Sequence, residues 1–128
     1  QTGRVAFADR GREVYVPRGA SCRATRERGA GTPVYDDAGA ALKSAVAVFD
    51  AATGSRVEPA RAVLAACERS DDALTAWHVA MDGEGAVADE GYGAMVRLVG
   101  EPEGVTKAAT MRREAGAIEG WKRKMGWW

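Results

Sequence analysis

The C-terminal part of the chain carries a regular apolar pattern, the strongest constraint on the fold that the sequence contains. After Pro102, apolar residues recur at spacings of three and four: Val105, Ala108, Met111, Ala115, Ile118, Trp121, Met125 and Trp128. Residues three and four apart lie on one face of an α-helix, so this spacing predicts one long helix with a seam close to a heptad repeat. We expect that helix to end at Gly126, because glycine readily adopts the left-handed conformation that closes many helices.

Three further helices are expected between residues 36 and 82, separated by short turns. Their inner faces are Leu42, Val46 and Phe49 in the first, Val63, Leu64 and Cys67 in the second, and Leu74, Trp77, His78 and Met81 in the third. Aspartates that can accept backbone N–H bonds precede the first and the third helix, and Pro59 suits the first turn of the second. Residues 86–100 fit either a short helix containing Gly91 and Gly93 or a strand over residues 94–99.

Residues 1–35 have no helical period and indicate an extended arm. The β-prone stretches RVAFA and EVYVP lie on either side of DRGR, which fits a hairpin or two arm segments. Prolines and glycines punctuate the rest of the arm. The sequence therefore predicts a mainly α protein. It would consist of an extended basic arm (residues 1–35) followed by a helical domain (residues 36–128), a small antiparallel bundle of four to five helices with a Trp-rich basic tail.

The charge is zero overall but unevenly distributed along the chain. Residues 1–35 carry a net +4, residues 36–104 a net −8 and residues 105–128 a net +4. The basic ends either fold over the acidic middle or bind an anionic partner. Nucleic acid is excluded as a partner class, because the acidic middle would repel phosphate. No apolar run is long enough for a transmembrane helix.

No group of residues forms a recognisable catalytic, cofactor or metal site, so we expect no enzyme activity, no cofactor and no metal. His78 is the only histidine, and its sequence neighbours supply no partner for acid–base chemistry. The turn GEGAVA at residues 83–88 has the letters of a dinucleotide-binding motif, but no strand precedes it. Asp82, Glu84, Asp89 and Glu90 could at most form a loose cation site, because the glycine and acid positions of a calcium loop are missing.

Two cysteines, Cys22 and Cys67, leave two alternatives open. A disulfide between them would tie the arm to a helix and indicate an oxidising compartment, such as an organelle lumen. Two buried thiols are the other interpretation, and the compartment itself is then unknown.

The tail GWKRKMGWW holds three of the four tryptophans and three consecutive cations. Trp and Arg are common anchors of protein interfaces, and Trp beside cations also suits a membrane surface. We therefore expect a non-catalytic accessory subunit that docks on other subunits of a larger assembly, with contact to a membrane surface as a further option. The expected partner-binding residues are Arg4, Arg10, Arg12, Arg18, Trp121, Lys122, Arg123, Lys124, Trp127 and Trp128. The alternative is a small ligand-binding or enzymatic helical domain with a pocket near Trp77 and His78.

Overall fold

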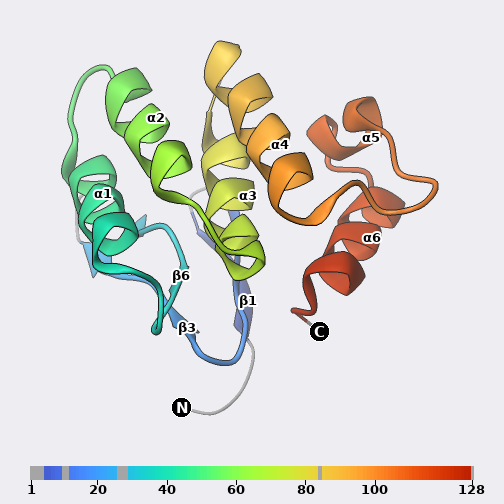
Figure 1. Cartoon of the computed structure of the whole chain (residues 1–128), viewed down its shortest axis with the longest axis horizontal. Coiled ribbons are helices and arrows are strands. Elements are labelled where there is room, and N and C mark those ends of the chain that lie inside the picture. Colours follow the sequence, from blue (N-terminus) through green and yellow to red (C-terminus); the bar gives the residue numbers. More distant parts are fainter. Residues whose placement is uncertain (1–4, 10–11, 26–28, 84, 128) are drawn as a thin grey trace.

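The computed structural model describes residues 5–9, 12–25, 29–83 and 85–127, and this part of the chain is mainly helical (Figure 1). Its α-helices are α1 (Ala40–Ala51), α2 (Val57–Ala66), α3 (Ala73–Asp82), α4 (Ala86–Val99), α5 (Lys107–Met111) and α6 (Ala115–Met125). A short 3-10 turn, η1 (Ser70–Asp72), leads into α3. The predicted fold class is confirmed, and residues 86–99 form a helix rather than a strand. No helix in the described ranges has the length and apolar character needed to cross a bilayer.

Strands occur before residue 36 and pair as short antiparallel ladders. They are β1 (Val5–Asp9), β2 (Arg12–Val16), β3 (Ala20–Ser21), β4 (Ala24–Thr25), β5 (Gly29–Ala30) and β6 (Val34–Tyr35). β1 pairs with β2 in a register that runs from Val5↔Val16 to Asp9↔Arg12, so the expected hairpin is present. β3 pairs with β6, and β4 pairs with β5. The described part of this region also reaches the core, because Val14 and Tyr15 are buried.

Helix α3 is the centre of the fold. All of its residues from Ala73 to Ala80 are buried, including the polar Thr75 and His78, so the helix is packed on every side. The sequence predicts a single inner face for this helix, and Met81 at its end is in fact only half-buried. Gly91 explains how α4 comes so close, because a Cβ at this position would lie 2.7 Å from the Cα of Ala80. The glycine that weakens α4 locally is therefore required by its packing on α3.

The long C-terminal helix predicted from the apolar spacing is wrong, because the chain breaks into α5 and α6. Thr106 Oγ1 accepts the backbone N–H of Ala109 at 3.1 Å and starts α5. Arg113 then adopts a left-handed conformation with φ of 57°, which ends the helical path. The reversal brings Thr110 against Trp121, whose indole Nε1–H donates to the Thr110 hydroxyl at 2.9 Å. Both side chains are buried, so a tertiary contact fixes the break.

Arginine side chains from later segments cap the C-terminal ends of three helices. Arg56 donates to the carbonyl of Phe49 in α1, with its guanidinium 3.8 Å from the centre of the Phe49 ring. Arg97 donates to the carbonyl of Leu64 in α2 at 3.3 Å, and Arg113 donates to a carbonyl in the last turn of α3. Terminal helix carbonyls lack partners within the helix and carry a partial negative charge, so guanidinium groups stabilise them. These three cations therefore act within the fold.

Candidate functional site

Six aromatic side chains form one buried cluster that includes the tail residue Trp127: Tyr15, Trp77, His78, Tyr92, Trp121 and Trp127. Gly126, with φ of 73°, closes α6, and the N–H of Trp127 donates to the carbonyl of Lys122 at 3.0 Å. This six-to-one bond is the mark of a Schellman turn, which reverses the direction of the chain after a helix. The reversal carries the Trp127 ring inward until only 2% of the residue is exposed. The ring stacks on Tyr15 of β2 at 5.4 Å and meets Trp77 of α3 edge-on at 5.6 Å.

His78 is a structural member of this cluster. Its Nε2 accepts the backbone N–H of Tyr15 at 3.1 Å, and its Nδ1 lies 2.8 Å from the carbonyl of Leu74. An acceptor at Nε2 and a donor at Nδ1 define the neutral tautomer. The Trp127 ring stacks on the imidazole, with the ring centres 6.1 Å apart. Nε2 therefore joins β2 to α3, and the Nδ1 bond within α3 fixes the orientation of the ring.

The indole nitrogen of Trp77 is the one fully buried side-chain polar atom without a hydrogen bond in the described part of the chain. The rings of Tyr15, Trp121 and Trp127 lie around it, with centroids 5.6–6.4 Å away. Aromatic faces are weak acceptors for N–H groups, which offsets part of the cost of burying this one. Tyr15 satisfies its hydroxyl differently, by donating to the Glu13 carboxylate at 2.9 Å. Burial, followed by this hydrogen bond, raises the pKa of the Tyr15 phenol, so the phenol stays neutral.

The expected partner-binding residues separate into three groups. Trp121 and Trp127 are buried in the core, so their rings are not exposed to a partner, contrary to the expectation from the sequence. Lys122 is half-buried, whereas Arg123, Lys124 and Arg18 are exposed. Outside the described residues lie Arg4, Arg10, Trp128 and the side chain of Arg12. No local signal distinguishes Trp127 from a surface tryptophan, because its burial depends on Tyr15 and Trp77, far away in the sequence.

The structure brings the end of helix α6 beside strand β2. Lys122 Nζ lies 4.7 Å from the centre of the Tyr15 ring, and Trp127 stacks on the rings of Tyr15 in β2 and His78 in α3. The last turn of α6 therefore lies beside the β1–β2 hairpin. We call the exposed part of this turn, Arg123 and Lys124, the α6 basic end. The side chains of Arg123 and Lys124 make no ion pair or hydrogen bond with other described residues. Lys107 in α5, by contrast, forms an ion pair with Asp89 at 2.9 Å.

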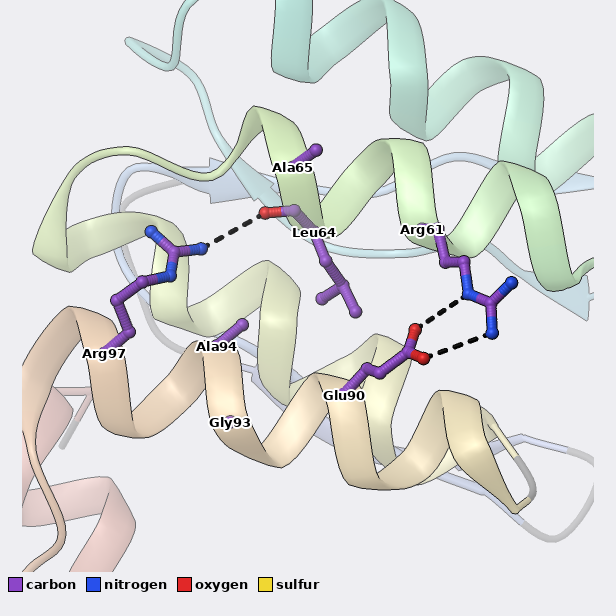
Figure 2. Close-up of a pocket in the computed structure, with 7 residues that line it drawn as sticks. All are labelled: Arg61, Leu64, Ala65, Glu90, Gly93, Ala94 and Arg97. Carbon is purple, nitrogen blue, oxygen red and sulfur yellow. Dashed lines mark hydrogen bonds and ion pairs between the residues drawn. The ribbon is translucent and has the colours of Figure 1, made fainter.

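A second feature is a shallow groove between α2 and α4, with a volume of about 420 Å³ (Figure 2). The floor of the groove is apolar. It consists of Leu64 and three small residues, Ala65, Gly93 and Ala94. Arg61 closes one end with a forked ion pair to Glu90, with nitrogen–oxygen distances of 2.9 and 3.1 Å. Arg97, which caps α2, lies at the other end. A Cβ added to Gly93 would have nothing within 4 Å, so the floor at this position faces open space.

The two cysteines are thiols in the structure rather than halves of a disulfide. Cys67 is buried, with its Sγ 3.4 Å from the Val63 carbonyl, and burial raises the pKa of this thiol to about 12. A thiol that stays protonated is a poor nucleophile and a poor metal ligand. Within the described residues no group of three His, Cys, Asp or Glu side chains is arranged to hold a metal ion.

Comparison of the chain with protein-family models, with curated proteins and with solved structures gave no match.

Proposed function

We propose that this chain is a non-catalytic accessory subunit that docks on an acidic surface of a larger protein assembly through the α6 basic end and the adjoining β1–β2 hairpin. The observation that carries the proposal is the placement of exposed, unpaired Arg123 and Lys124 beside the hairpin of an arm whose residues 1–35 carry a net +4. Most other described cations of the helical region serve as helix caps or in ion pairs. These two are available to a partner.

The geometry favours a fixed rather than a flexible surface. Trp127 and Lys122 both contact Tyr15, so the end of α6 and strand β2 are held together by a stacked ring pair and a cation over a ring. Charges held in place by a rigid scaffold lose little conformational entropy on binding. Such charges mainly accelerate association and set specificity, and salt weakens their effect.

The proposal moves the expected binding role of the tail from its tryptophans to its cations. Trp121 and Trp127 support the surface from inside, and Arg123 and Lys124 make the contact. Arg4, Arg10, Arg12 and Arg18 of the arm remain proposed partner residues. A membrane surface rich in anionic lipid is the competing partner, and the experiment distinguishes the two.

The test compares two double variants with the same change in net charge. Arg123→Glu/Lys124→Glu reverses the α6 basic end, and Lys107→Glu/Arg112→Glu reverses two cations of the α5 region that already have acidic partners. Tagged full-length chains are expressed in the native host, and their association with co-purifying subunits is quantified by mass spectrometry at low and moderate salt. We expect association to fall by about tenfold or more only for the α6 variant, and to fall with salt for the wild type.

Equal retention of subunits by both variants would refute the role of the α6 basic end. Flotation of the purified chain with vesicles containing phosphatidylserine tests the membrane. Binding to these vesicles that is lost in the α6 variant, without loss of protein partners, would assign the surface to lipid and overturn the proposal.

A further inference from the structure

His78 links α3 to the β1–β2 hairpin through a hydrogen bond that requires an uncharged ring. The backbone N–H of Tyr15 can only donate, so Nε2 of His78, 3.1 Å away, must accept. The carbonyl of Leu74 can only accept, so Nδ1, 2.8 Å away, must carry the proton of the ring. The two partners thus fix the tautomer. A second proton could bind only at the Nε2 lone pair, which the hairpin already occupies.

A proton on Nε2 would oppose the position of β2. Two donors, the new Nε2–H and the backbone N–H of Tyr15, would then face each other across 3.1 Å. The positive charge would also lie on a residue that is only 4% exposed, and a buried charge without a partner is costly. Strand β2 must move away from α3 before the new N–H can reach water. Protonation therefore favours separation of the hairpin from α3.

The other contacts of the ring tolerate the same proton. Nδ1 donates to the carbonyl of Leu74 in the neutral ring and also in the charged ring, so this bond within α3 is kept. The Trp127 ring stacks on the imidazole with an angle of 28° between the planes. An aromatic face attracts a cation, so this contact with the end of α6 does not oppose the charge. Of the three contacts, only that with β2 is lost.

The charged groups near the Tyr15–His78 contact come from β2, from α3 and from the α6 region. Among the described residues they are Glu13 on β2, Asp82 one helical turn after His78 on α3, Arg113 before α6, and Glu119 and Lys122 on α6. Carboxyl groups ordinarily titrate near pH 4, and lysine and arginine titrate above about pH 10. The sequence contains a single histidine. A measurement between about pH 5.5 and pH 7.5 therefore reports on His78.

We propose that His78 is a proton-operated fastening for the β1–β2 hairpin: the neutral ring holds strand β2 on α3, and the protonated ring releases it. The released state binds a proton that the closed state excludes. Histidine in an unfolded chain titrates near pH 6.5, so the closed state is fully favoured above this pH and loses stability as the pH falls below it. The inference concerns the fold and does not depend on the proposed function.

The experiment uses the Tyr15 backbone N–H as the probe, because this group makes the bond in question. Native-state hydrogen exchange of the full chain, followed by nuclear magnetic resonance, gives the opening constant of each amide. We expect the opening constant of Tyr15 to rise by about tenfold from about pH 7.5 to about pH 5.5. Amides within α1 and α3 should change by less than about twofold. His78→Gln is the matched variant, because its side-chain carbonyl can accept the Tyr15 N–H but takes up no proton, so its opening constant should not vary with pH.

A second measurement needs no variant. The nitrogen chemical shifts of the wild-type imidazole should show the proton on Nδ1 at about pH 7.5. A proton on Nε2 at that pH overturns the proposal. An opening constant of Tyr15 that does not respond to pH, or that responds equally in His78→Gln, also overturns it. An equal rise for the amides of α1, α3 and Tyr15 does the same, because acid would then unfold the whole chain rather than release the hairpin.

Discussion

Replacing Trp127 by alanine tests the central finding, that a residue of the tail belongs to the core. The side chain is 2% exposed and contacts the rings of Tyr15, Trp77 and His78. Removing a buried tryptophan costs about 3–5 kcal/mol in the free energy of unfolding. The aromatic contacts contribute within this figure, at about 0.5–1.5 kcal/mol for each pair. Small domains have about 5–15 kcal/mol in total, so the variant should lose a large share of its stability.

The assays are urea unfolding and thermal unfolding, both followed by far-ultraviolet circular dichroism, with Lys124→Ala as the surface control. Each kcal/mol corresponds to about 4 °C in the thermal midpoint at this size, so Trp127→Ala should melt about 12–20 °C below the wild type. Lys124→Ala should stay within about 0.5 kcal/mol. Because the change leaves an apolar cavity, added indole should raise the midpoint of Trp127→Ala and leave that of the wild type unchanged.

An exposed tryptophan would give a different result. If Trp127→Ala changed the free energy of unfolding by less than about 0.5 kcal/mol, the ring could not be part of the core. Loss of stability without any response to indole would contradict the idea of a defined cavity between β2 and α3.

Two further predictions follow from the packing. Gly91→Ala should lower the free energy of unfolding by about 1–3 kcal/mol, because the new Cβ would lie 2.7 Å from α3. In Gly93→Ala the new Cβ meets nothing within 4 Å, so this variant should raise the free energy of unfolding by about 0.5–1 kcal/mol. Urea unfolding measures both changes, and changes of the same sign would refute the packing argument. At about pH 8 the native chain should react with a thiol reagent faster at Cys22 than at Cys67, because burial raises the pKa of Cys67 from 9.0 to about 12. The raised pKa also means that the contribution of Cys67 to stability is present below pH 9 and is lost as the pH rises toward 12, so Cys67→Ala should flatten the fall in stability over that range.

Much of the fold could be predicted from local patterns. Leu42, Val46 and Phe49 lie on the buried face of α1, and Val63 and Leu64 lie on the buried face of α2, as their spacing indicates. The hairpin and the helix end at Gly126 were also predicted, because strand alternation and left-handed glycine are properties of a few neighbouring residues. The same local reasoning could not reveal that α3 is buried on every side, since this depends on what packs around it.

The errors arose where a contact between distant segments outweighed a local pattern. The apolar spacing after residue 104 favours one helix, but the bond from Trp121 to Thr110 requires the chain to turn back. Three arginines cap helices through carbonyls seven or more residues earlier in the chain, and these caps are not among the predictions made from the sequence. The residues within one helical turn of these positions carry no pattern that predicts either the Trp121–Thr110 bond or the arginine caps.

The sequence by itself determined the class of fold, the positions of most helices and the uneven charge of the chain, because periodicity, turn residues and charge are local properties. The tertiary structure decided the role of the tail. Gly126 ends α6 in either case, but only the space left between Tyr15, Trp77 and His78 decides that Trp127 turns inward. Burying this ring removes a large apolar surface from water, and that gain depends on residues brought together by folding. The cations next to it stay at the surface, because removing their charges from water has a high cost in free energy.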